Sequence, residues 1–408
     1  MRRVYFDNNA TTPVLPEVFE AMRPYFGEQF GNASSLHHHG QETRAAVERA
    51  RESVGAFVGC RAAEIVFTSG GTEADNLAVF GVARAGDHVI TSSIEHHAVL
   101  NACRYLEERG CDVTYIPVDS RGVVDPGDVK RALRPNTKLI SIMMANNETG
   151  VVQPVAAIGR IAAEADVYFH TDAVQAAGKI PVCVDVIGCD LLTISGHKLH
   201  GPQGVGALYV RKGTELEARQ YGGRHERSRR AGTENVPGIV GLGRAAEIAR
   251  TALDGGEDQR IGDLRDRLER ELLKIESTSV NGADTHTSQN ARCVGHPHPS
   301  LTCVPNTANI CFDGIDGEAL LIALDLKGLA VSTGAACSSG AIEPSHVLLA
   351  MGLTPEQARA SIRFSLGKQN TAEDVDFAVR LVADTVARLR ELSPVWKVAA
   401  SFEPRAAG

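Results

Sequence analysis

The residue with the clearest chemical potential in this sequence is Lys198, which closes the stretch Ser-Gly-His-Lys at 195–198. The apolar run at 191–194 before it predicts a short buried strand. Burying an ammonium group is costly, so a lysine at the end of such a strand tends towards a lower pKa. A neutral amine can attack an aldehyde and form a Schiff base. A lysine that caps a surface turn is the alternative, and the neighbouring residues favour the reactive amine.

An aspartate closes another apolar run, at 167–171. Asp172 can pair with a protonated pyridine nitrogen, which is the partner that pyridoxal phosphate needs in order to act as an electron sink. Ser195 and His197, in the same stretch as Lys198, offer hydrogen-bond donors of the kind that hold a phosphate. Together these residues predict a pyridoxal 5'-phosphate site.

A further phosphate-binding signal lies at 68–73, where Thr-Ser-Gly-Gly-Thr-Glu follows the apolar run 65–67 and opens a helix. A strand-to-helix turn of this kind exposes free backbone N–H groups at the positive end of the helix. It lacks the Gly-Lys-Ser/Thr of a nucleotide P-loop. An ordinary strand–helix turn is the alternative, and it explains the glycines but not the Ser/Thr cluster.

Strand-like and helix-like segments alternate through the first half of the chain. Besides the strands already described, we expect strands at 88–91, 113–116, 139–144 and 205–210, and helices at 35–58, 72–84, 97–109, 126–133 and 154–165. This rhythm predicts an α/β fold with a mostly parallel sheet covered on both faces. Ligands of such sheets bind at the carboxyl ends of the strands. Five polar residues fall there: Thr72, His96, Asn147, Asp172 and Lys198.

A second reactive group is Cys337, which lies among small residues at 331–340. Small neighbours give no packing reason to bury the thiol, so it is a candidate nucleophile that acts as the thiolate. Arg363, in a predicted strand at 361–365, is expected to point inward, in alternation with its apolar neighbours. It suits bidentate binding of a substrate carboxylate, and a structural ion pair is the alternative.

The length of 408 residues predicts two domains. The second domain should contain helices at 263–275, 318–325 and 371–392 and strands at 310–312 and 361–365. A net charge of −8 without a basic patch predicts no nucleic-acid partner. The basic segment 221–230 is interpreted as flexible, solvated surface. The absence of a long apolar run and of a signal-peptide core predicts no membrane role. The nine scattered cysteines fit reduced thiols in the cytoplasm.

Motifs along nearly the whole chain identify a family. They stand at 5–13 (Tyr-Phe-Asp-Asn-Asn-Ala-Thr-Thr-Pro), 72–76, 95–96, 146–150 (Asn-Asn-Glu-Thr-Gly), 170–175, 195–198, 230–235, 334–337 (Gly-Ala-Ala-Cys), 343–346 and 363–365. With them the chain resembles cysteine desulfurases of the NifS/IscS type, which are class V aminotransferase-like, fold-type I pyridoxal phosphate enzymes. The segments 227–235 and 392–396 resemble the NifS branch. Two departures, at 32–37 and 225–227, concern substrate access and dimer contacts.

The resemblance implies a large cofactor-binding domain over 15–260, with a mainly parallel seven-stranded sheet flanked by helices. A smaller α+β domain, formed by 1–14 and 261–408, would carry the catalytic cysteine loop. The implied activity removes sulfur from L-cysteine, giving L-alanine and a persulfide on Cys337. An iron–sulfur scaffold of the NifU/IscU type would accept the sulfur, Cys337 could contact the cluster during transfer, and a nitrogenase role is expected.

The resemblance also implies a role for each site residue. Lys198 would hold the cofactor, Asp172 would pair with its ring nitrogen, and His96 would stack on the ring and assist proton transfers. The ring's phenolic oxygen would be bound by Asn147 and Gln175. The phosphate would be held by Gly71, Thr72, Ser195, Gly196 and His197, with Thr233 from the other subunit of a homodimer. The substrate carboxylate would be bound by Arg363, Asn147 and Asn32.

Other functions remain open at this point. A class V aminotransferase would share Lys198 and Asp172 but needs no reactive cysteine, and a selenocysteine lyase would use closely related chemistry. A non-enzymatic sulfur carrier or scaffold could use Cys337 alone, with no reason for the lysine and aspartate.

The aperiodic stretch 281–306 carries four candidate zinc ligands: Cys293, His296, His298 and Cys303. Two thiolates and two imidazoles can complete a tetrahedral zinc site and stiffen a loop. The spacing is not that of a standard zinc finger, and prolines 297 and 299 restrict the imidazoles. A solvated loop with incidental ligand-type residues is the alternative.

Overall fold

The computed structural model describes residues 2–283, 302–334, 343–393 and 396. Its larger part is built on a seven-stranded sheet with the order β2-β8-β7-β6-β5-β3-β4. The strands are β2 (Ile65–Thr68), β3 (His88–Ser92), β4 (Asp112–Ile116), β5 (Thr137–Ser141), β6 (Tyr168–Asp172), β7 (Leu191–Ser195) and β8 (Gly206–Val210). β8 runs antiparallel to its two neighbours, β2 and β7, and the other neighbouring strands are parallel. The predicted mainly parallel seven-stranded sheet is therefore confirmed.

Successive apolar residues of the strands point to opposite faces of this sheet, as the pleat requires. Val89, Leu139 and Leu191 pack in one core, whereas Ile90, Ile140 and Leu192 pack in the other. The helices that cover the sheet are α1 (Pro16–Met22), α2 (His38–Val58), α3 (Gly71–Val82), α4 (His97–Glu108), α5 (Pro126–Ala132), α6 (Val155–Glu164), α7 (Val184–Ile187) and α8 (Val236–Asp254). Because both faces are buried, apolar residues occupy successive positions in these strands, as in β3, β5 and β7, instead of only every second position.

A smaller unit surrounds the antiparallel sheet β12-β10-β9. Its elements are β9 (Thr278–Val280), β10 (Thr307–Phe312), β12 (Ser361–Ser365), α9 (Glu257–Leu272), α10 (Gly317–Leu326), α11 (His346–Ala350), α12 (Pro355–Arg359) and α13 (Ala372–Leu392). The N-terminal strand β1 (Val4–Tyr5) pairs with β11 (Leu329–Ala330), and Val4 and Phe6 belong to the core of this unit. The domain limits at 15 and 260 stay a prediction.

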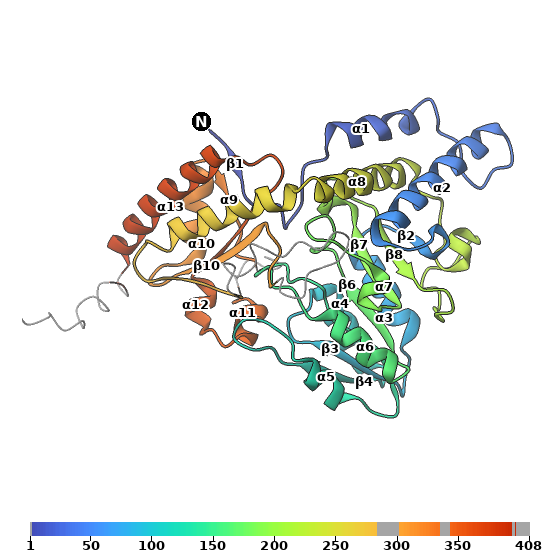
Figure 1. The fold of residues 1–408 in the computed structure, drawn as a ribbon, viewed down its shortest axis with the longest axis horizontal. Helices are drawn as coiled ribbons and strands as arrows, with labels where there is room; N and C mark the ends of the chain where they lie inside the picture. The colour runs from blue at the N-terminus through green and yellow to red at the C-terminus, as the bar shows by residue number, and fades with distance from the viewer. Residues whose placement is uncertain (1, 284–301, 335–342, 394–395, 397–408) are drawn as a thin grey trace, which may run out of the picture.

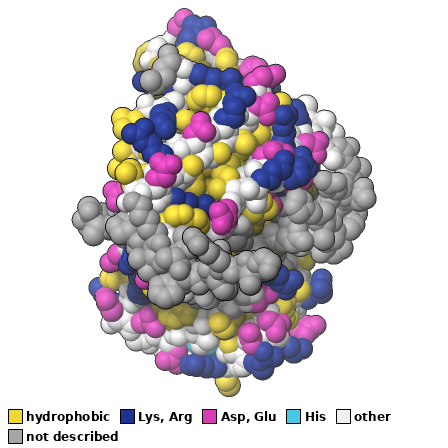
Figure 2. All heavy atoms as spheres, turned by 90° about the vertical axis from the view of Figure 1, so that its left-hand side faces the viewer, with side chains coloured by type: hydrophobic (Ala, Val, Ile, Leu, Met, Phe, Trp, Pro, Cys, Tyr) yellow, Lys and Arg dark blue, Asp and Glu magenta, His cyan; other side chains and the backbone are white. Residues whose placement is uncertain are grey.

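The face of the smaller unit in Figure 2 mixes Lys and Arg with Asp, Glu and apolar side chains. The described residues of that face therefore form no continuous basic patch. No helix in the described part of the chain is long and apolar enough to cross a membrane.

Several boundaries differ from the sequence expectations. The strand predicted at 139–144 is β5, which ends at Ser141, and the helix predicted at 35–58 begins at His38. The long helix α8 was not expected, because its glycines lower helix propensity. They serve close packing instead: a Cβ at Gly243 would lie 2.7 Å from the Cβ of Ala50 in α2. Figure 1 shows α2 and α8 beside each other.

The interpretation of 221–230 as solvated surface is wrong at Glu226. Its carboxylate accepts hydrogen bonds from Arg51 Nη1 (2.6 Å) and Nη2 (2.8 Å) and from the Phe67 N–H (2.9 Å), and both charged side chains are buried. Glu226, Arg227 and Ser228 all have positive φ, at 44°, 57° and 65°. Such backbone costs of the order of 1–3 kcal/mol per residue, so it persists only where its surroundings fix it. The buried ion pair with Arg51 does so here.

We expect Arg51→Met to lower the free energy of unfolding by about 3–5 kcal/mol, because it leaves the Glu226 carboxylate buried without its partner. Urea denaturation followed by circular dichroism measures the change. Arg244→Met is the matched control: it removes an exposed pair with Glu247 (2.8 Å), which is worth about 1 kcal/mol or less. Equal effects of the two substitutions would show that the buried pair does not hold the segment.

Candidate functional site

The candidate site lies at the carboxyl ends of β2, β6 and β7. Lys198 follows β7 in a short 3₁₀ turn, Gly196–Lys198. Its amine donates to the carbonyl oxygens of Asn9 and Ala10, the latter at 2.8 Å. Burial, followed by the positive charge of Arg363, lowers the pKa of Lys198 to about 8, while Asp7 and Asp172 oppose the shift. The Lys198 amine therefore loses its proton closer to neutral pH than an ordinary lysine amine does.

This pKa predicts the pH dependence of cofactor capture by the apoenzyme. Only the deprotonated amine is a nucleophile, so the capture rate should rise about tenfold per pH unit below pH 8 and level off above it. Stopped-flow absorbance after mixing apoenzyme with pyridoxal phosphate measures this rate. A rate that keeps rising towards the ordinary lysine value of 10.5 would contradict the prediction.

Asp172 ends β6 and is buried. Burial raises its pKa to about 6, while the Val174 N–H that donates to Oδ1 at 2.8 Å and the nearby Lys198 limit the rise. At neutral pH the group is therefore mainly a carboxylate, and a cationic ring nitrogen would stabilise it further.

The turn at 68–71 that was predicted to bind phosphate, here called the phosphate seat, leads into α3. The N-cap of this helix is Gly70, which has no side chain to cap the first N–H groups of the helix. A Cβ at Gly71 would lie 3.0 Å from Val174 Cγ2. Ser195 Oγ is buried and has no hydrogen-bond partner among the described residues. An unpaired buried hydroxyl beside free N–H groups at a helix N-terminus fits a phosphate ester. The residues present thus suit the predicted cofactor.

Two histidines at this edge are neutral donors. His197 Nδ1 lies 3.1 Å from Thr11 Oγ1, and burial followed by the charge of Lys198 lowers its pKa to about 4. His96 is the N-cap of α4, and its Nδ1 accepts from the Ala98 N–H at 3.1 Å, so Nε2 carries the proton. The side chain of His96 is accessible to solvent. Burial by the surrounding protein, followed by the positive charge of Lys198, nevertheless lowers the pKa of His96 to about 4.

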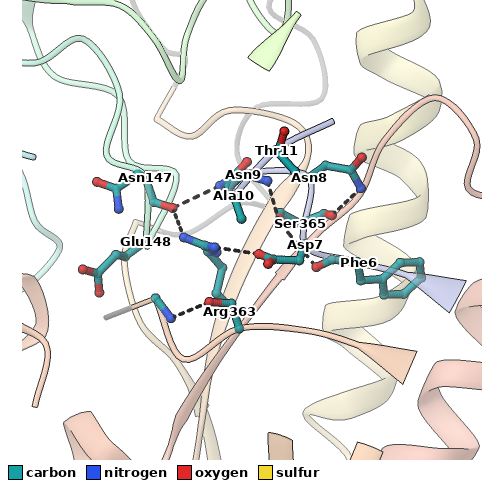
Figure 3. Close-up of polar contacts among 12 residues, drawn as sticks. Phe6, Asp7, Asn8, Asn9, Ala10, Thr11, Asn147, Glu148, Arg363 and Ser365 are labelled. Atoms are coloured by element: carbon teal, nitrogen blue, oxygen red, sulfur yellow. Dashed lines mark hydrogen bonds and ion pairs between the residues drawn. The ribbon is translucent and has the colours of Figure 1, made fainter. Parts of the chain in front are cut away.

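Arg363 lies on β12, in the smaller unit, and reaches the same edge (Figure 3). Its Nη2 donates to Asp7 Oδ1 at 2.7 Å and its Nη1 to the Asn147 carbonyl at 2.9 Å. The ion pair considered as the alternative is therefore present. Arg363 Nε is buried without a partner among the described residues, which leaves a donor for a further acceptor.

Asn9 links these groups although the sequence patterns did not single it out. Its Nδ2 donates to the Asn147 carbonyl at 3.1 Å and to Thr307 Oγ1 at 2.8 Å, and its own carbonyl accepts from Gln175 Nε2 at 3.0 Å. Asn9 thus joins both units at the site (Figure 3). The only local signal was a polar turn, because its partners are distant in sequence.

Other predicted site residues are not brought to Lys198 within this chain. The side chains of Asn32 and Thr233 are exposed. Asn32 Oδ1 accepts from the Ser34 N–H at 2.9 Å, which is a local turn contact. The predicted roles of both residues stay predictions.

Cys337 lies outside the described residues, but the segments that flank it do not. Ser332 exchanges backbone hydrogen bonds with Arg363, with N···O distances of 2.6 and 3.2 Å. On the other side, Ser345 Oγ donates to Glu148 Oε2 at 2.5 Å. A Cβ at Gly334 would lie 2.9 Å from the same carboxylate oxygen. Both flanks therefore meet the site edge beside Arg363.

Of the four candidate zinc ligands, Cys293, His296 and His298 also lie outside the described residues. Cys303 is buried against Val151 and Ala283, and burial raises the pKa of its thiol to about 11. In the described part of the chain it is a packed thiol, and the zinc site stays a prediction.

Comparisons with known proteins agree over nearly the whole chain. The aminotransferase class-V family model matches residues 4–377. A curated cysteine desulfurase IscS of Dictyoglomus turgidum is 49% identical over 405 residues, covering 97% of this chain and 98% of its own. A solved structure described as a NifS-like protein is 38% identical, with a TM-score of 0.85, and the match covers 95% of this chain and 100% of that one. Another, described as SspA in complex with cysteine, is 36% identical, with a TM-score of 0.75 and coverages of 90% and 99%.

Proposed function

The chain belongs to the aminotransferase class-V family, among the cysteine desulfurases of the NifS/IscS type, and we propose that it takes sulfur from L-cysteine through Cys337. Enzymes of this family depend on pyridoxal 5'-phosphate. When bound, this cofactor withdraws electrons from the Cα of an amino acid.

The observation that supports this function is the meeting of Lys198, Asp172 and the phosphate seat with Arg363 at one edge. The Lys198 amine, with a pKa of about 8, attaches the cofactor and can move a proton at the substrate Cα. Asp172 would hold the ring nitrogen of the cofactor, and Ser195 Oγ with the N–H groups of α3 would hold its phosphate. Arg363 binds the substrate carboxylate through Nε and whatever donors Asp7 leaves free.

The sulfur step uses Cys337 as a thiolate. A bond forms between Cys337 Sγ and the substrate sulfur while the substrate C–S bond breaks. The electron pair of that bond stays with the substrate carbon, which takes a proton and leaves as L-alanine. The product on the protein is a persulfide, which can pass its outer sulfur to an acceptor thiol.

The physiological setting that we propose follows the resemblance to the NifS branch at 227–235 and 392–396. The acceptor is an iron–sulfur scaffold of the NifU/IscU type, with a nitrogenase-associated role in the cytoplasm. The enzyme acts as a homodimer in which the exposed Thr233 of one copy reaches the phosphate of the other. Sedimentation of the protein alone tests whether it is a homodimer, and sedimentation with the scaffold protein tests whether the two proteins bind each other.

The function itself is tested by incubating the purified holoenzyme with L-cysteine and assaying alanine, sulfide and protein persulfide together. Equal amounts of alanine and transferred sulfur are expected. L-Selenocysteine in parallel tests the lyase alternative, which a strong preference for that substrate would favour. Transamination with a keto acid, without sulfide, would favour the class V aminotransferase and contradict the proposal.

A further inference from the structure

Lys179 is a second lysine beside the site, and the proposed chemistry does not use it. It follows Gly178 in the turn after β6, where φ is +76° and a Cβ on the glycine would lie 2.6 Å from Leu199 Cδ2. This close approach presses the turn against the residue next to Lys198. Lys179 and Lys198 line one cavity between the two units, together with Lys368.

The Lys179 amine makes two short hydrogen bonds. Its Nζ donates to Gln175 Oε1 at 2.5 Å and to Asn9 Oδ1 at 2.9 Å. Asn306 Nδ2 also donates to Asn9 Oδ1, at 3.0 Å, whereas Lys179 is the only donor to Gln175 Oε1 among the described residues. A lysine ammonium has donors only, so both amides must turn their oxygen towards it. Burial, then the charges of Lys198 and Arg363, lowers the pKa of Lys179 well below its usual value. The neutral amine still has two N–H groups for these two acceptors, so the contacts hold in either state.

The opposite ends of both amides hold the acceptors of the reacting groups. Gln175 Nε2 donates to the Asn9 carbonyl, which is the carbonyl that also accepts from Lys198 Nζ. Asn9 Nδ2 donates to the Asn147 carbonyl, which also accepts from Arg363 Nη1 (Figure 3). The two ends of an amide group are nearly identical in shape, so only donor and acceptor partners fix its direction.

We propose that Lys179 is a positioning residue for the reaction at Lys198, because it fixes the direction of the Gln175 amide and, together with Asn306, that of the Asn9 amide. It thereby keeps Gln175 Nε2 and Asn9 Nδ2 as donors at the site edge. This inference rests on the proposed function in taking Lys198 as the lysine that attaches the cofactor. Lys179 touches no reacting atom itself and acts through the two amides.

Lys179→Met tests the proposal because it keeps the length of the side chain and removes its donors. We expect the apoenzyme to bind pyridoxal phosphate about 10- to 100-fold more weakly, and kcat with L-cysteine to fall by more than KM changes. Lys179→Arg, which restores a donor-only cation, should recover most of both losses. Lys368→Met is the matched control: it removes a positive charge from the same cavity, and no hydrogen bond of its side chain to the site amides is present among the described residues. It should behave like the wild type.

Three further outcomes decide the question. Unchanged cofactor affinity and kcat in Lys179→Met would overturn the proposal. So would equal losses in the Met and Arg variants, or in Lys179→Met and Lys368→Met, since packing or charge alone would then explain them. Borohydride reduction and peptide mapping of the wild-type holoenzyme keep the two assignments apart. Cofactor trapped on Lys198 leaves only the Lys179 result to decide the inference, whereas cofactor trapped on another lysine overturns the proposed function itself.

Discussion

Lys198→Ala is expected to abolish covalent attachment of the cofactor and to lower desulfuration by about four orders of magnitude or more. Lys198 is the lysine at the carboxyl end of β7, beside Asp172 and the phosphate seat. Lys179 is close but is directed at Gln175 and Asn9. After borohydride reduction, the wild-type holoenzyme should therefore yield a peptide that carries the cofactor on Lys198. The Lys198→Ala variant should yield no peptide that carries the cofactor.

The variant should still bind pyridoxal phosphate non-covalently, because Asp172, Ser195 and the N-terminus of α3 are unchanged. Cofactor retained on dialysis without a reducible bond distinguishes loss of the amine from loss of the fold. Covalent trapping of the cofactor in Lys198→Ala at the wild-type level would refute the assignment.

Cys337→Ser is expected to keep the bound cofactor and its spectral change on addition of L-cysteine, yet to release no sulfide above background. The lysine and the thiol serve separate steps, so cofactor binding and sulfur transfer should come apart in this variant. Absorbance spectroscopy and a sulfide assay on the same sample measure the two. Near-normal sulfide release would sink the assignment of the nucleophile.

Cys60→Ser provides the matched control. Burial raises the pKa of the Cys60 thiol to about 12, with Glu64 adding to the shift, so this thiol is protonated at neutral pH and is a poor nucleophile. Desulfuration should survive the substitution. A comparable loss in both variants would mean that serine at these positions perturbs the enzyme without removing a nucleophile.

The sequence predicted those features that are written locally. Apolar strands followed by a polar residue placed Asp172 and Lys198 at one sheet edge, and the structure has both strands, β6 and β7, adjacent and parallel. The Gly-Gly turn before α3 was also readable, because a helix N-terminus needs few residues to specify it. Arg363 was recognised as inward, but its pairing with Asp7 was only an alternative, since it joins distant parts of the chain.

What the sequence did not predict depends on long-range partners. The burial of Glu226 requires Arg51, which lies far away in α2, so the local run of basic residues pointed the wrong way. The glycines of α8 allow it to pack closely against α2. Because glycine has a low helix propensity, the local sequence did not predict this helix. The role of Asn9 arises only when it meets Asn147 and Thr307, which lie 138 and 298 residues further along the chain.

The pairing of the N-terminal strand with the end of the chain has a consequence for biosynthesis. Asn9 and Ala10, whose carbonyl oxygens accept from the Lys198 amine, are translated before Lys198 itself. Their segment is held by β11 and by the bridge from Asp7 to Ser365, which are made late. A nascent chain that has exposed Lys198 and Asp172 therefore cannot hold the two carbonyl acceptors of the Lys198 amine in place until Ser365 has left the exit tunnel. Productive cofactor loading is thus expected only after Ser365 has been made.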